Sequence, residues 1–161
     1  MKQAQVKSAK TVKATRAGKF VDTAHVDTLK SNYKSERWIQ NSRKLGKEDS
    51  LSVWYSVEEL EQFLAEAKSH GGDGVRMYFG AYSQVNAPNP LYAGRQTIVM
   101  VATSVKDTDG MVVNKDLYIS TPTGSNIVAY NLGKMCPPFC GGHEGGIEEM
   151  EIRITDMAIT I

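Results

Sequence analysis

The chain has 161 residues, of which 41% are hydrophobic and 23% charged, and its 19 basic and 18 acidic side chains nearly cancel. This composition excludes a wholly disordered chain, a collagen-like fibre and a disulfide-packed miniprotein. The longest apolar run, residues 98–102, is far shorter than the ~20 residues of a membrane-spanning helix, and the N-terminus lacks the apolar core of a secretory signal. We therefore expect a soluble, cytoplasmic protein without membrane contact.

The near-neutral total hides a separation of charge along the chain. Residues 1–47 carry 12 Lys or Arg against three acids, a net charge of +9, whereas residues 48–161 carry 7 against 15, a net charge of −8. A basic segment of this kind binds an outside polyanion or lies on an acidic surface of its own domain or of another copy. We divide the chain into a basic arm, residues 1–21, and one α+β domain, residues 22–161.

Basic side chains recur at every third position of the arm: Lys7, Lys10, Lys13, Arg16 and Lys19. On an α-helix this spacing gives a slowly winding ridge, and on an extended segment it keeps the charges on one face. We expect a helical arm that makes the protein a homo-oligomer. A nucleic-acid contact that weakens as salt rises, a solvated tail and an organelle-targeting peptide are the alternatives.

An apolar stripe at helical spacing, formed by Val26, Leu29 and Tyr33, predicts a helix from about residue 23 to residue 44. Its second half is polar apart from Trp38 and the residue that follows it. A tryptophan in this position is either a stacking platform for nucleic-acid bases or an anchor in the core. We favour the core anchor.

The clearest local pattern is strand, helix, strand between residues 51 and 82. Ser56 and Glu59 form a capping box, in which each side chain bonds the other residue's backbone amide, so a helix begins there. The helix is long enough for a right-handed parallel crossover between two strands, and an antiparallel return is the alternative. The face expected to be buried consists of Val57, Leu60, Phe63, Leu64 and Ala67.

Two turns in the second half of the chain predict antiparallel hairpins. An apolar strand over residues 96–105 and a turn at residues 107–110 lead into a strand over residues 111–120. A second turn, residues 121–125, precedes a short strand over residues 126–130. The whole pattern predicts an α+β fold: a four- or five-stranded, largely antiparallel sheet with one crossover helix, a helical basic arm and a C-terminal element.

That C-terminal element, residues 147–161, fits two patterns. Its apolar residues recur at helical spacing, whereas its β-branched content and the alternation of Met150, Ile152 and Ile154 favour a strand. We expect a helix, with a strand as the alternative. In either case isoleucines remain for a second surface, which is typical of an assembly contact.

Both cysteines, Cys136 and Cys140, lie in one loop with His143 and Glu144. Two thiols, an imidazole and a carboxylate are a suitable donor set for zinc, although the spacing is not that of a standard zinc finger. The two prolines between the cysteines favour extended backbone, so a disulfide requires a tight turn or a cis bond. We favour a packing loop with two buried thiols, and a metal site or a redox or nucleophilic thiol are the alternatives.

A second candidate site lies on the predicted strand that ends near residue 82. Arg76, Tyr78 and Tyr82 share one face of that strand, and with Arg95 they are expected to line an anion or aromatic ligand pocket beneath the loop of residues 83–94. An exposed strand face without a ligand is the alternative.

The chain contains none of the dinucleotide, phosphate-loop, hydrolase-elbow or zinc-protease motifs. Our leading hypothesis is a non-enzymatic binding or assembly domain that self-associates through its basic arm and an acidic surface. The alternatives are a small metal- or thiol-dependent enzyme centred on the cysteine loop, with zinc as its cofactor, and a nucleic-acid binder that uses the basic stripe.

Overall fold

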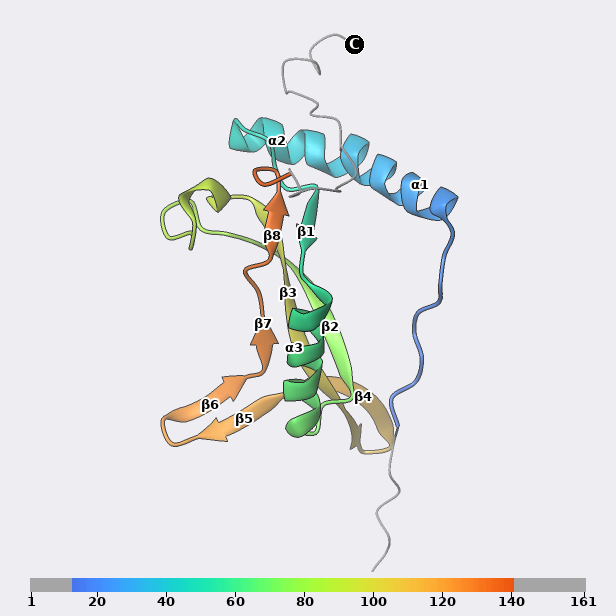
Figure 1. Cartoon of the computed structure of the whole chain (residues 1–161). Helices are drawn as coiled ribbons and strands as arrows, with labels where there is room; N and C mark the ends of the chain where they lie inside the picture. Colours follow the sequence, from blue (N-terminus) through green and yellow to red (C-terminus); the bar gives the residue numbers. More distant parts are fainter. Residues whose placement is uncertain (1–12, 141–161) are drawn as a thin grey trace, which may run out of the picture.

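The computed structural model describes residues 13–140, and the fold is given for these residues. Figure 1 shows a long helical rod lying across one end of a twisted antiparallel sheet, with a shorter helix against one face of that sheet. The helical segments are α1 (Thr23–Tyr33), the π-helical η1 (Lys34–Trp38), α2 (Ile39–Leu45), α3 (Val57–Ser69) and the 3-10 turn η2 (Pro90–Tyr92). The strands are β1 (Ser52–Trp54), β2 (Gly74–Ala81), β3 (Gln96–Thr108), β4 (Met111–Asp116), β5 (Tyr118–Thr121), β6 (Gly124–Ile127), β7 (Ala129–Tyr130) and β8 (Lys134–Cys136).

The long N-terminal helix is confirmed, and it consists of α1, η1 and α2 without a break. The carboxylate of Asp22 accepts a hydrogen bond from the backbone N–H of His25, at 2.9 Å, and caps the first turn. The helix ends at Gly46, whose φ of 69° lies in the left-handed region that glycine adopts without strain.

The prediction that the arm itself is helical is wrong for its described part. Residues 13–21 form no helix, and each of them is exposed. Lys13, Arg16 and Lys19 repel one another at helical spacing without an acid between them, and Gly18 lowers helix propensity further. Lys7 and Lys10 lie outside the described residues, as does the predicted C-terminal helix or strand at residues 147–161.

The main sheet is built around β3, the longest strand. β2 pairs with β3 along one edge, and β4 and β7 pair with successive parts of the other edge, all in antiparallel fashion. Two further pairs, β5–β6 and β1–β8, are also antiparallel. The largely antiparallel character and the two predicted turns are confirmed.

The strand count and the role of α3 differ from the prediction. The described residues form eight strands in one four-stranded and two two-stranded sheets, instead of one sheet of four or five strands. β1 pairs with β8 and not with β2, so α3 connects strands of different sheets and is not a crossover within one sheet. β1 has only three residues, so its sequence pattern does not indicate which strand it pairs with. Alternation over three residues fits a strand in either orientation.

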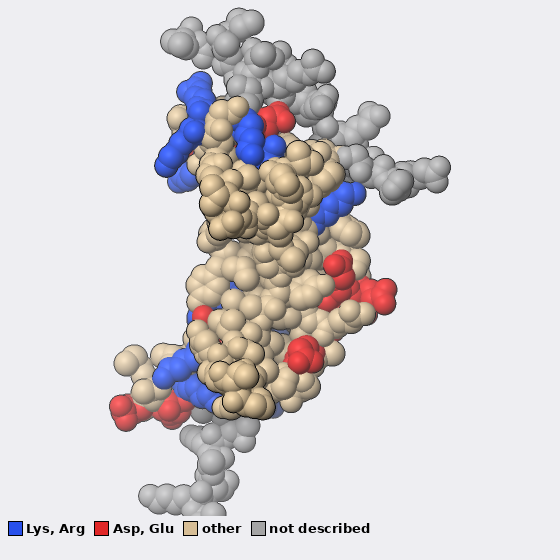
Figure 2. Space-filling model, turned by 90° about the vertical axis from the view of Figure 1, so that its left-hand side faces the viewer, with Lys and Arg blue, Asp and Glu red and all other residues tan. Residues whose placement is uncertain are grey.

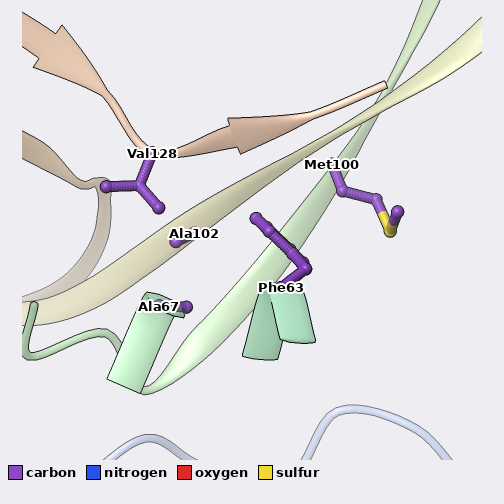
Figure 3. Packing of buried hydrophobic residues seen from close by; sticks show 5 residues of the cluster. All are labelled: Phe63, Ala67, Met100, Ala102 and Val128. Carbon is purple, nitrogen blue, oxygen red and sulfur yellow. The ribbon is translucent and has the colours of Figure 1, made fainter. Parts of the chain in front are cut away.

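The main core lies between α3 and β3 (Figure 3). Phe63 and Ala67 of α3 pack against Met100 and Ala102 of β3 and against Val128, which lies between β6 and β7. Val57 and Leu64 were also expected on the buried face of α3, but both are exposed, because α3 contacts the sheet along a narrow stripe.

The capping box of α3 is confirmed in both directions. The Ser56 backbone N–H donates to the Glu59 carboxylate at 2.8 Å, and the Glu59 backbone N–H donates to the Ser56 hydroxyl at 3.1 Å. These bonds from Ser56 lower the pKa of Glu59.

Replacement of Ser56 by alanine removes the acceptor for the Glu59 amide, so we expect the free energy of unfolding to fall by about 1 kcal/mol. Urea denaturation followed by circular dichroism measures this change, and Ser69→Ala at the other end of α3 is a matched control. An equal loss in both variants contradicts the assignment of the cap.

Candidate functional site

A short segment, residues 48–51, connects the long helix to the sheets. It follows α2 and precedes β1, and both Asp49 and Ser50 are buried. The Trp38 indole N–H donates to the Asp49 carbonyl at 2.7 Å, and the Asp49 N–H donates to the Ser42 hydroxyl at 2.9 Å. With Met135, these residues form a second buried region around Trp38, which is 1% exposed, so the predicted core anchor is confirmed.

The Asp49 carboxylate is the acceptor at the centre of this region. One of its oxygens accepts the backbone N–H groups of Ser50, at 2.8 Å, and Gln96, at 2.7 Å. The other accepts the side-chain amide of Asn41 at 2.9 Å. Asp49 therefore binds together α2, the segment before β1 and the first residue of β3.

Tyr33 closes the region at the end of α1. Its hydroxyl donates to the Ser50 carbonyl at 3.1 Å. Burial, and secondarily the negative charge of Asp49, raise the pKa of Tyr33 to about 12. The hydroxyl is therefore a neutral hydrogen-bond donor at physiological pH.

Arg95 lies beneath the cysteine loop and bonds three separate backbone carbonyls. Its guanidinium donates to Leu91 at 2.8 Å, to Glu48, and to Pro137 at 3.4 Å. Burial lowers the pKa of Arg95, and the charges of Asp49 and Glu48 oppose that effect. Arg95 holds the loop of residues 83–94 and the cysteine loop in place. Its three hydrogen bonds go to backbone carbonyls and not to a ligand.

Cys136 and Cys140 are joined in a disulfide. Both peptide bonds that precede the prolines are cis, and the two Cα atoms lie 4.6 Å apart, within the range that a disulfide requires. The expectation of two separate buried thiols is therefore wrong. Cys136 is 8% exposed at the end of β8, whereas Cys140 is exposed at the end of the described chain.

Zinc binding by this loop requires the reduced cysteines. A thiolate is the metal ligand, and neither sulfur of a disulfide supplies one. His143 and Glu144 lie outside the described residues, and residues 13–140 contain no group of three or more His, Cys, Asp or Glu side chains that could hold a metal ion. The zinc site stays a prediction for the reduced protein.

Aromatic rings cover one side of the cysteine loop. Tyr82 and Tyr92 stack with their ring centroids 5.7 Å apart, and Tyr92 meets Phe139 edge-on at 5.9 Å. The Tyr82 hydroxyl donates to the side-chain carbonyl of Asn131 at 2.7 Å. Tyr82 and Arg95 thus belong to the surroundings of this loop.

Arg76 and Tyr78 lie apart from that group, on the main sheet. The Arg76 guanidinium donates to the Asp116 carboxylate and, at 2.7 Å, to the Asn114 carbonyl, while the Tyr78 hydroxyl donates to Asp116 at 2.7 Å. The bond to Tyr78, followed by the charges around it, raises the pKa of Arg76. The structure therefore places Arg76 together with Tyr78, whereas Tyr82 lies in the region of Arg95. The four side chains do not converge on a common ligand.

The described residues include two grooves of interest. The larger, about 400 Å³, runs between α3 and the β5–β7 region and has Phe63, Ile119 and Tyr130 in its walls. The smaller, about 180 Å³, lies where the end of α1 approaches β1 and the main sheet, and is lined in part by Tyr33, Phe79 and Ile98. We call the second one the Tyr33–Phe79 groove.

Exposed apolar side chains lie in the arm, on α1 and on β2. No residue of α1 is fully buried: Val26 and Leu29 of its stripe face solvent, as does Phe20 in the arm, and Tyr33 is half-buried. On β2, Met77 is 62% and Phe79 is 82% exposed. The sequence pattern predicts the stripe on α1, but it does not show that Val26 and Leu29 stay exposed.

Basic side chains gather at one end of the described surface. Figure 2 shows a group of Lys and Arg side chains at the end of the molecule that carries α2, and groups of Asp and Glu side chains farther along the body. On α3 three acids are exposed: Glu58, Glu61 and Glu66. We call these three the acidic side of α3.

Comparison of the chain with protein-family models, with curated proteins and with solved structures gives no match. None of the helices in residues 13–140 combines the length and apolar composition that crossing a membrane requires. A function for this chain therefore has to be argued from its own geometry.

Proposed function

We propose that the chain is a binding and assembly domain that self-associates through its basic arm. In this arrangement the arm and α1 of one copy lie on the Tyr33–Phe79 groove, the β2 face and the acidic side of α3 of a second copy. The observation that carries the proposal is that Val26 and Leu29, in the apolar stripe of α1, are exposed, whereas Tyr33 at the end of the helix is half-buried.

The apolar contribution favours a second copy over a free arm. Phe20 and Leu29 on one surface and Met77 and Phe79 on the other are all exposed. Full burial of such a side chain stabilises by about 1.5–3 kcal/mol, so covering these four on each of two copies is of the size needed to offset the ~4–15 kcal/mol that association costs. A two-fold arrangement covers both surfaces at once, because each copy supplies one arm and one groove.

Charge complementarity selects the same partner. Lys13, Arg16 and Lys19 are exposed in the arm, and the acidic side of α3 follows directly after β1, which lines the groove. A basic arm seated in the groove of a second copy would therefore lie within reach of acids, whose attraction is strongest at low salt. Nucleic-acid binding by the stripe, including Lys7 and Lys10, and a cytoplasmic location stay predictions.

Light scattering and sedimentation of the full chain test this proposal. We expect a dimer at 50 mM salt whose dissociation constant rises at least tenfold at 500 mM salt and at least tenfold in Phe20→Ser or Leu29→Ser. Each of these side chains is exposed, so the substitutions leave the fold intact. Val85→Ser is the matched control, because Val85 is 85% exposed but lies in the loop of residues 83–94.

A monomer at both salt concentrations, up to about 100 μM protein, would overturn the proposal. A dimer that Phe20→Ser and Leu29→Ser leave unchanged would overturn it as well. The chain could instead be monomeric by itself and bind a random oligonucleotide with an affinity that falls as salt rises. That result would show that the arm binds nucleic acid and not a second copy.

A further inference from the structure

We propose that the Cys136–Cys140 disulfide undergoes thiol–disulfide exchange with a thiol or dithiol substrate, and that the substrate attacks the Sγ of Cys140. Neither cysteine lines the Tyr33–Phe79 groove, although β8, which carries Cys136, pairs with β1 in the wall of that groove. The experiments below report on the disulfide whether or not the chain dimerises.

The two ends of the disulfide differ in access. Cys136 is 8% exposed and follows Met135, which is fully buried. Cys140 is exposed and lies four residues further along the chain. Exchange requires the incoming thiolate to reach one sulfur, and the rate depends on which sulfur is accessible. The geometry therefore directs attack to Cys140 and makes the Sγ of Cys136 the leaving group.

The Cys136 end is also fixed to the rest of the molecule. Its carbonyl accepts the Leu51 backbone N–H at 2.7 Å, and β8 pairs with β1 in the register Ser52 with Cys136. Next in the chain, the Pro137 carbonyl accepts a hydrogen bond from Arg95. These contacts hold the leaving sulfur in place, so any movement after reduction is confined to Cys140.

Phe139 connects the two ends of the loop. Its backbone N–H donates to the Met135 carbonyl at 2.9 Å, and its ring meets Tyr92 edge-on. These contacts do not involve either sulfur, so they keep the loop closed after reduction. The two thiols then stay close enough to form the disulfide again, which a reversible exchange site requires.

The reaction balances with a dithiol as the reductant. One thiolate of the dithiol forms a bond to the Sγ of Cys140, the Cys136–Cys140 bond breaks, and its electron pair leaves on the Sγ of Cys136, which takes up a proton. The second thiol of the substrate, after losing its proton, displaces the Sγ of Cys140. Two electrons pass to the protein, which becomes a dithiol, and the substrate becomes a disulfide.

A matched pair of single-cysteine variants tests the direction of attack. Cys136→Ser leaves the exposed Cys140, and Cys140→Ser leaves the buried Cys136. Each full-length variant is mixed with oxidised glutathione, and the mixed disulfide is followed by mass spectrometry. We expect Cys136→Ser to react at least tenfold faster than Cys140→Ser. Equal rates, or a faster reaction of Cys140→Ser, would overturn the proposal.

The wild-type protein supplies a second readout that does not depend on how the variants fold. Native protein is treated with a monothiol, quenched with acid and mapped by peptide mass spectrometry. We expect the mixed-disulfide adduct on Cys140, with tryptophan fluorescence unchanged because Trp38 stays buried. An adduct on Cys136, or a disulfide that opens only in denaturant, identifies a purely structural bridge and contradicts the proposal.

Discussion

Replacement of Asp49 by alanine is expected to lower the free energy of unfolding by about 3–5 kcal/mol. The carboxylate accepts two backbone N–H groups and one side-chain amide at a position that is 2% exposed. Removing it leaves these donors without an acceptor, and each such buried group costs about 1–3 kcal/mol unless water reaches it. A loss of this size is a large fraction of the stability of an ordinary domain.

Asp49→Asn is the matched control, because it has nearly the same shape. Its carbonyl oxygen still accepts from Ser50 and Gln96, but its amide faces the donating amide of Asn41. We expect it to lose less stability than Asp49→Ala in guanidinium denaturation followed by circular dichroism. A loss below about 1 kcal/mol for Asp49→Ala would show that residues 48–51 do not depend on this carboxylate.

Trp38→Ala is expected to cost a similar amount, about 3–5 kcal/mol, for a different reason. The indole is 1% exposed, and its removal leaves a cavity at a buried position of the long helix. It also removes the donor to the Asp49 carbonyl. Trp38→Phe keeps a ring but loses that donor, so the difference between the two variants separates packing from the hydrogen bond.

The same measurement tests whether Trp38 is a core anchor or a stacking platform. Thermal and guanidinium denaturation of both variants are compared with wild type, and Trp54→Ala, which removes an exposed tryptophan, is the control. If Trp38→Ala is as stable as Trp54→Ala, the ring is not a core anchor. The Asp49→Ala and Trp38→Ala effects are not expected to add, because the two residues share a hydrogen bond.

Local features of this fold were predictable from the sequence because their causes lie within a few residues. Ser56 and Glu59 satisfy each other's amides, Gly46 supplies a left-handed turn, and the turn at residues 107–110 returns β3 into β4. Each of these depends on a single glycine or on residues within four positions of one another.

Long-range pairing was not predictable in the same way. Nothing in the three residues of β1 indicates that they pair with β8, some eighty residues later, so the sequence alone favoured one continuous sheet. The apolar stripe of α1 was recognised as amphipathic, but a pattern of spacing does not reveal whether the partner is in the same molecule.

The candidate sites illustrate the same limit. Arg95 and Tyr82 were grouped with Arg76 because the alternation of a strand places side chains on one face, yet their partners come from other segments. Asp49 was missed altogether, since one acid among polar residues after a helix carries no distinctive signal. The sequence shows the cysteine pair, but whether the two cysteines form a disulfide depends on the conformation of the loop, which the sequence does not determine.

Because Ser52 lies opposite Cys136, β1 meets its strand partner only when translation has nearly reached the end of the described chain. Until Met135 and Cys136 have left the ribosome, Ser50 and Leu51, which follow the long helix, lack their partners on β8. The segment that joins the long helix to the sheets is therefore completed late, and during synthesis it is open to chaperones and to other unfinished copies.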